Sequence, residues 1–127
     1  MELEKFGTSG AITELLSIRD DVDRITNLHL ASDGLTPKVD IFDTGDAYQL
    51  MVEVPGVSQE NLEVAVQGTS VIVAGLREPV DDSVKIINME RPRGHFQRTV
   101  QLPGEVERER TTAHLQEGVL VLTLPKT

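Results

Sequence analysis

Residues 113–126 read Ala-His-Leu-Gln-Glu-Gly-Val-Leu-Val-Leu-Thr-Leu-Pro-Lys, and this stretch decides the fold. The part from Val119 to Leu124 is apolar on both faces apart from one hydroxyl residue, which is typical of a fully buried central strand. Glu117-Gly118 directly before it is a turn signal. The stretch therefore predicts a central strand of a sheet that is entered through a tight turn.

Upstream of this stretch, apolar and polar residues alternate with a period of two, as they do in half-buried strands. The alternating segments are Val39–Ile41, Tyr48–Val54 and Leu62–Val66, and Val71–Leu76 is a second fully apolar strand. Turn signals separate the segments, at Thr44-Gly45-Asp46, Pro55-Gly56, Gly68-Thr69 and Pro103-Gly104. Parallel strands would need crossover helices, for which there is no room, so we predict an antiparallel β-sandwich.

The first 35 residues have a different pattern and are predicted to form a separate arm on a sandwich of residues 36–127. From Ala11 to Leu30 the apolar residues recur at steps of three and four, which predicts an amphipathic helix of about five turns. The residues of this apolar stripe are Ile12, Leu15, Ile18, Val22, Ile25 and Leu28. The stripe could pack on its own domain or on another subunit or partner. We favour the second, because the remaining sequence looks complete without it.

Residues 78–93 are predicted to form a long loop that carries an extra strand, within Val84–Met89. Loops of this length in a compact domain usually have a purpose. A strand on a long arm can reach a neighbouring subunit and pair with its exposed sheet edge.

Composition excludes several function classes. The chain has 127 residues, no cysteine and a formal net charge of −9, so disulfides and thiolate metal sites are excluded and polyanions such as nucleic acid or anionic membranes are repelled. The three histidines are far apart in sequence, and there is no P-loop and no G-x-S-x-G motif. We expect no enzyme activity, no cofactor and no metal. With no targeting signal and no apolar run long enough for a membrane, we expect a cytoplasmic protein.

Asp43-Thr44-Gly45 allows one alternative, because D-T-G after an apolar strand is the signature of aspartic proteases, some of which are all-β homodimers of similar size. The simpler interpretation is a turn, in which all three residue types are favoured.

Arg98 lies in the apolar phase of its strand, between Phe96 and Val100. A covered guanidinium needs carboxylate or carbonyl partners, and Glu90 or an acid of a second chain is the natural candidate. Alternatively, Arg98 lies at a sheet edge and extends its charged end to solvent.

The chain from Pro37 to Lys126 resembles the α-crystallin domain of the small heat shock proteins, of the bacterial and plant type. The resemblance is carried by Val39-Asp40-Ile41, Asp43-Thr44, Tyr48, Pro55-Gly56-Val57, Glu60-Asn61-Leu62, Val64, Gly75-Leu76-Arg77, Glu90-Arg91, Gly94, Phe96, Arg98, Leu102-Pro103, Ala113, Leu115, Gly118-Val119-Leu120 and Leu124-Pro125-Lys126. It places Asp43-Thr44 at an acidic-Thr turn and so argues against the protease. Glu117 departs from the usual asparagine, which weakens the preference for a type I′ hairpin.

The resemblance implies an all-β, immunoglobulin-like antiparallel sandwich and a homodimer made by strand exchange. The strand of the 78–93 loop would pair with the partner's edge strand at residues 38–42. The interface residues would be Val39, Ile41, Ile86, Glu90, Arg91 and Arg98.

The resemblance also implies a groove that accepts an I-x-I motif from a C-terminal extension. Its apolar lining would be Leu62, Val64, Val66 and Leu115. The sequence ends at Thr127 with no such motif after Leu124, so we expect the groove to be unoccupied unless a client or another protein enters it.

The function implied is that of an ATP-independent holdase chaperone. It would bind unfolding client proteins through the N-terminal stripe and the groove and prevent their aggregation. The alternative is an adaptor that uses the same sandwich to bind one folded partner.

Overall fold

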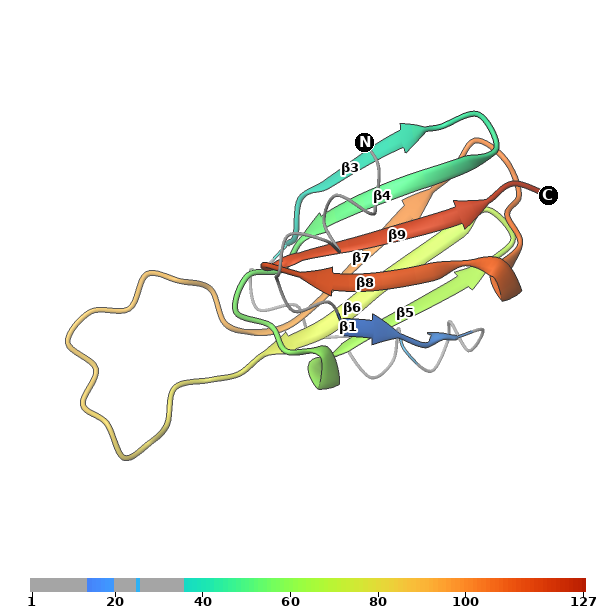
Figure 1. The fold of residues 1–127 in the computed structure, drawn as a ribbon. Coiled ribbons are helices and arrows are strands. Elements are labelled where there is room, and N and C mark those ends of the chain that lie inside the picture. Colours follow the sequence, from blue (N-terminus) through green and yellow to red (C-terminus); the bar gives the residue numbers. More distant parts are fainter. Residues whose placement is uncertain (1–13, 20–24, 26–35) are drawn as a thin grey trace.

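A computed structural model describes residues 14–19, 25 and 36–127, and these form a two-layer β-sandwich (Figure 1). The five-stranded sheet has the order β1-β8-β9-β4-β3, and the four-stranded sheet has the order β2-β5-β6-β7. The strands are β1 (Glu14–Leu16), β2 (Ile18–Arg19), β3 (Val39–Asp43), β4 (Ala47–Glu53), β5 (Leu62–Gln67), β6 (Ser70–Arg77), β7 (Gly94–Gln101), β8 (Thr112–Gln116) and β9 (Val119–Pro125), with short 3₁₀ turns η1 (Gln59–Asn61) and η2 (Arg108–Arg110). The predicted all-β sandwich is confirmed.

The core lies between the sheets and consists mainly of aliphatic side chains. It is filled by the alternate residues that the period-two pattern indicated, such as Val64 and Val66 on β5 and Leu120 and Leu122 on β9. Phe96 on β7 is fully buried among them. Gly75 on β6 is needed for this packing, because a Cβ there would meet the backbone oxygen of Asn61 and lie 2.8 Å from Phe96 Cζ.

The turn between β8 and β9 is the two-residue turn Glu117-Gly118. Both residues have positive φ, 51° for Glu117 and 78° for Gly118, which is the requirement of a type I′ hairpin. The ladder that follows pairs Gln116 with Val119 and Leu115 with Leu120. The hairpin therefore forms although its first turn residue is a glutamate, because the core contacts and the ladder outweigh the local backbone cost.

The predicted N-terminal helix is wrong for residues 14–19, which are extended. β1 pairs antiparallel with β8, and β2 pairs parallel with β5. Ile25 is helical and fully buried against Ala65, Ile72 and Ala74 on the outer face of the four-stranded sheet. An isolated helix of this length is marginal in water, so the backbone partners offered by two sheet edges decide the conformation. The other residues of the predicted helix lie outside the described part of the chain.

The loop of residues 78–93, all described, projects from one end of the sandwich and contains no strand in the single chain (Figure 1). Its apolar side chains are exposed, with 50% of Ile86 and 93% of Ile87 accessible to solvent. Among the described residues there is no helix long and apolar enough to cross a membrane.

We predict that Glu117→Asn stabilises the protein. A left-handed conformation costs about 1–2 kcal/mol for an ordinary L-residue, whereas asparagine tolerates it, so we expect a gain of about 0.5–1 kcal/mol in the free energy of unfolding. Urea denaturation measures this gain. Glu117→Gln is the matched control, since it removes the charge of this exposed side chain but keeps the backbone cost. An equal gain in the control would assign the effect to charge and contradict the prediction.

Candidate functional site

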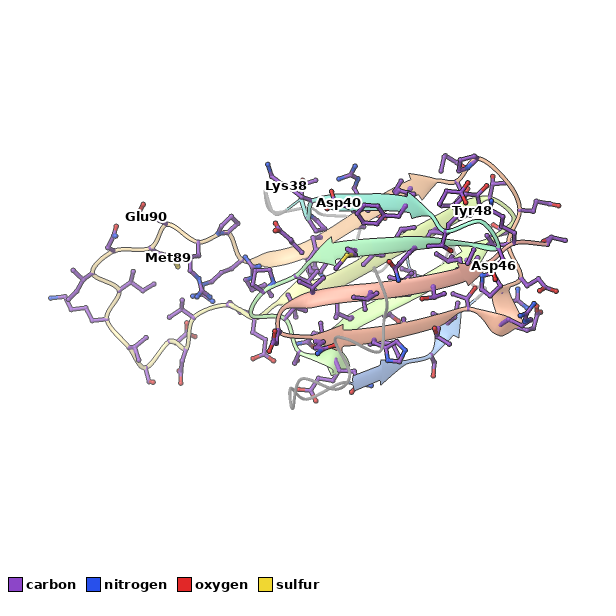
Figure 2. The ribbon with its side chains drawn as sticks, turned by 45° about the horizontal axis from the view of Figure 1, so that its top comes forward. Lys38, Asp40, Asp46, Tyr48, Met89 and Glu90 are labelled. Carbon is purple, nitrogen blue, oxygen red and sulfur yellow. The ribbon has the colours of Figure 1, made fainter. Side chains whose placement is uncertain are left out.

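The first candidate surface is the outer edge of β3 together with the projecting loop. Within the described part of the chain β3 is the last strand of its sheet, so one side of its backbone has no strand partner. Ile41 and Phe42 on β3 are 44% and 43% exposed. Figure 2 shows Lys38 and Asp40 at the start of β3, at the end of the sandwich from which the loop projects with Met89 and Glu90. The loop therefore projects from the end of the sandwich at which β3 begins, and both the loop and the strand carry exposed apolar side chains.

The six predicted interface residues lie in this region, but one chain does not bring them into a single cluster. Val39 is partly buried and packs against the core, while Ile41 and Ile86 are exposed. Glu90 and Arg91 are exposed on the loop, where Glu90 Oε2 accepts a hydrogen bond of 2.8 Å from Asn88 Nδ2. The prediction missed four further exposed apolar residues, namely Phe42, Val84, Ile87 and Met89. Val84, Ile87 and Met89 belong to the same run as Ile86, which the sequence analysis had predicted to carry the extra strand. That apolar run was therefore the signal that could have identified them.

Arg98 joins the two sheets at this side of the sandwich. It is partly buried on β7, and its Nη1 donates a hydrogen bond of 3.0 Å to the backbone oxygen of Pro37, just before β3. The partner of Arg98 is thus a carbonyl oxygen, one of the two kinds of partner, carboxylate or carbonyl, that the sequence allowed. The contact holds the start of β3 against the other sheet, and so places the free edge of β3.

Arg77 fixes the base of the projecting loop. Its side chain is only 8% exposed. Nη2 donates to the Pro55 oxygen at 2.6 Å, and Nη1 donates to the Pro92 oxygen at 3.0 Å. Burial, and then the charges of Arg91 and Arg93, lower the pKa of Arg77. One guanidinium thereby links β6, the turn after β4 and the returning end of the loop.

The second candidate surface is the predicted groove between β5 and β8. Leu62, Val64, Val66 and Leu115 are together in the buried core and line the sandwich where these two strands face each other. The expectation of an unoccupied groove is wrong, because Leu16 and Ile18 of the chain's own N-terminal segment pack against this cluster. Sequence reasoning looked for a motif after Leu124 and did not consider Leu16-Ser17-Ile18, which has the same spacing of aliphatic residues. Beside this segment lies a hollow of about 550 Å³, lined partly by Leu16, Ser17 and Leu62.

The predicted client-binding stripe is only partly within the described residues. Ile18 and Ile25 both pack on their own domain, which is the alternative that the sequence left open. The backbone of Leu15 lies in β1, opposite His114. Ile12, Val22 and Leu28 lie outside the described residues.

Asp43-Thr44-Gly45 is a tight turn between β3 and β4. Gly45 N donates to Asp43 Oδ1 at 2.9 Å, and Thr44 Oγ1 donates to the Ala47 oxygen at 3.0 Å. Lys126 Nζ lies 2.9 Å from Asp43 Oδ1, and this hydrogen bond lowers the pKa of the carboxyl group. The carboxylate of Asp43 and the hydroxyl of Thr44 are thus both used within the turn, which favours the simpler interpretation. In the ranges that the structure describes, no three His, Asp or Glu side chains are grouped to hold a metal ion.

Comparison with models of protein families supports the resemblance that the sequence indicated. The model of the Hsp20/alpha crystallin family matches residues 40–127, from the second residue of β3 to Thr127. The chain belongs to this family.

Members of the family in bacteria and plants are similar to this chain in sequence. Small heat shock protein C4 of Rickettsia felis is 34% identical over 95 residues, which cover 72% of this chain and 58% of that protein. The 17.7 kDa class II heat shock protein of Arabidopsis thaliana is 33% identical over 91 residues, covering 68% of this chain and 58% of that protein. The chain thus spans somewhat more than half the length of these curated relatives.

Solved structures of the family show the same fold. Heat shock protein 16.0 from Schizosaccharomyces pombe has a TM-score of 0.68 and 28% identity, covering 73% of this chain and 88% of that chain. A small heat-shock protein from Xylella fastidiosa, whose structure is described as a distinct high order structure, has a TM-score of 0.65 and 27% identity, covering 75% and 88%.

We predict that Arg77→Lys destabilises the protein and loosens the base of the loop. A lysine cannot reach both carbonyl oxygens with a rigid fork, so one charge-assisted hydrogen bond is lost and the free energy of unfolding falls by about 1–2 kcal/mol. Chemical denaturation and amide exchange near Pro55 and Pro92 measure this. Arg93→Lys is the control, because Arg93 makes one hydrogen bond to the Glu78 oxygen at 3.2 Å, which lysine can keep. Equal losses in both variants would contradict the prediction.

Proposed function

We propose that this chain is an ATP-independent holdase chaperone, which binds unfolding proteins through apolar surfaces and prevents their aggregation. The observation that carries the proposal is the exposed apolar set on β3 and the loop of a well-packed domain of this family. That set is Ile41, Phe42, Val84, Ile86, Ile87 and Met89. Exposed apolar side chains on a sheet edge and on a projecting loop are typical of an interaction surface.

Part of this surface serves a homodimer made by strand exchange. Within the described residues the outer edge of β3 has no strand partner, and the loop carries Ile86 and its neighbours outside any strand. Addition of the loop of one subunit to the β3 edge of the other would pair the backbone groups of both and cover Ile41 and Ile86. Glu90, Arg91 and Arg98 would then be charges at or near the interface.

Client capture is physical rather than chemical. Unfolding proteins expose apolar surface and unpaired strand edges. Burial contributes about 25 cal/mol per Å² of apolar area, so a few side chains give weak and reversible binding. We assign this role to the predicted N-terminal stripe and to the groove lined by Leu62, Val64, Val66 and Leu115. The stripe includes Ile18 and Ile25, which pack on the domain and would have to leave it to bind a client.

The acidic balance fits the same proposal. A net charge of −9 keeps complexes with clients in solution and disfavours binding to nucleic acid or anionic membranes. We place the protein in the cytoplasm and expect that it acts without a cofactor.

We predict that the chain suppresses the light scattering of heated model clients at a near-stoichiometric ratio without nucleotide. Three unrelated clients are compared, with an equal mass of serum albumin as the control for crowding. Protection of all three, unchanged by added ATP, is the expected result, because apolar capture needs no hydrolysis. No protection at any ratio contradicts the proposal, and protection of a single client favours a specific adaptor instead.

We predict that Ile86→Asp abolishes the dimer, since a carboxylate cannot be buried at the edge of β3 without a partner. Sedimentation should show twice the chain mass of 14.0 kDa for the natural sequence and 14.0 kDa for the variant at micromolar concentration. Ser83→Asp is the matched control, because it adds the same charge to the same loop without removing an apolar side chain. A natural chain that is monomeric, or a variant that stays dimeric, contradicts strand exchange.

A further inference from the structure

Three arginines gather at the base of the projecting loop. β6 ends at Arg77, which is opposite Gly94, the first residue of β7. The loop of residues 78–93 therefore leaves and returns at neighbouring positions, as Figure 1 shows. Burial, and then the charges of Arg91 and Arg93, lower the pKa of Arg77. The returning end of the loop thus places two further positive charges beside a buried one.

Two of these guanidinium groups lie around one point beside Gly56, in the turn after β4. Gly56 has a φ of 80°, and a Cβ built on it would lie 3.7 Å from Arg77 Nε and 3.7 Å from Arg91 Nη2. Because glycine carries no side chain, the space between these two nitrogens and the turn stays open. An anion with several oxygens that is placed in this space can present one oxygen to each nitrogen.

The same cluster contains buried donors without an acceptor. Arg77 is only 8% exposed, and its Nε is buried with no hydrogen-bond partner among the described residues. The same holds for Nε of Arg93. Other donors of these two side chains are used, because Nη1 and Nη2 of Arg77 and Nη1 of Arg93 bond to backbone oxygens. A buried donor without an acceptor is costly, so these atoms indicate a site for an acceptor from outside this part of the chain.

No carboxylate of the described residues neutralises this cluster. The ion pairs between described residues include none of Arg77, Arg91 and Arg93. The acid next to Arg77 in sequence is Glu78, whose Oε1 accepts a hydrogen bond of 3.2 Å from Asn61 Nδ2. Three positive charges are thus held together in a chain whose formal net charge is −9. Their mutual repulsion favours a ligand that carries more than one negative charge.

We propose that Arg77, Arg91 and Arg93 form a binding site for a small phosphate dianion at the base of the loop. Arg77 Nε and Arg91 Nη2 donate to its oxygens in the space beside Gly56, and Arg93 supplies the third positive charge. Guanidinium groups suit this ligand, because their N–H groups match the geometry of phosphate oxygens in charge-assisted hydrogen bonds. The site needs neither a client nor a second subunit.

A bound dianion fixes the returning end of the loop. Arg77 is already held by the backbone oxygens of Pro55 and Pro92, whereas Arg91 is exposed. A phosphate shared by both guanidinium groups connects Arg91 to this fixed point. Amide exchange near Arg91 should therefore slow when phosphate is added, because the loop base opens less often.

The site is tested by calorimetric titration of the full chain with inorganic phosphate, at constant ionic strength set by sodium chloride. We expect one phosphate per chain. Arg91→Gln should weaken binding at least about tenfold, because it removes one charge-assisted hydrogen bond. Arg110→Gln is the matched control, since Arg110 is an exposed arginine of η2 whose partner is Glu107, and it should leave the affinity unchanged.

Three results of this titration would overturn the proposal. The first is no binding to the natural chain, which is also the result expected if a carboxylate of a second subunit fills the site. The second is equal weakening in Arg91→Gln and Arg110→Gln. The third is equal binding of phosphate and of acetate, since the site is inferred to require a dianion.

Gly56→Ala tests the position of the site without removing a charge, because its Cβ fills the space between the two guanidinium groups. Gly68→Ala is its control. Gly68 also has a positive φ, 63°, so the backbone cost is of the same kind, but nothing lies within 4 Å of a Cβ at that position. Gly56→Ala should lose phosphate binding and Gly68→Ala should keep it. Binding retained by Gly56→Ala, or lost equally in both, would overturn the placement. No readout involves a client, so failure here is distinct from failure of the holdase proposal.

Discussion

An open sheet ends in strands whose outer N–H and C=O groups have no ladder partner, and this constraint shapes the whole molecule. The two sheets of the sandwich face each other with β5 and β8 on one side and with β7 and β3 on the other. On the first side, β1 and β2 cover the gap. On the second side, Arg98 links β7 to Pro37, and in the part of the chain that the structure describes no strand pairs with the outer edge of β3, which carries the exposed Ile41 and Phe42.

The sandwich could be predicted from sequence because each strand repeats one local rule. Residues such as Val64 and Val66 alternate with polar or small neighbours, and the same residues fill the core. The N-terminal segment could not be predicted in this way, since Leu15, Leu16 and Ile18 fit a helical period and also a strand period. The choice between them depends on the free edges of β5 and β8, which lie far away in sequence and are visible only in the folded domain.

In the candidate site, too, some features follow from local sequence patterns and others depend on the folded domain. The four residues predicted to line the groove follow from the strand pattern, and all four belong to the buried core. The occupant of the groove was missed, because a tripeptide such as Leu16-Ser17-Ile18 carries no signal until a groove of matching shape exists. For Arg98 the sequence left open a covered guanidinium or one that extends to solvent, and the carbonyl partner at Pro37 that decides this depends on how the two sheets are stacked.

The two sides of the sandwich therefore differ in how easily they change. The β3 side is fixed by a charge-assisted hydrogen bond and by the ladder with β4, and the outer edge of β3 has no strand partner among the described residues. The β5–β8 side is covered by strands of three and two residues, so it opens at a lower free energy than the core. The difference follows from what holds each side: a side-chain hydrogen bond and a five-residue ladder on one, and two short edge strands on the other.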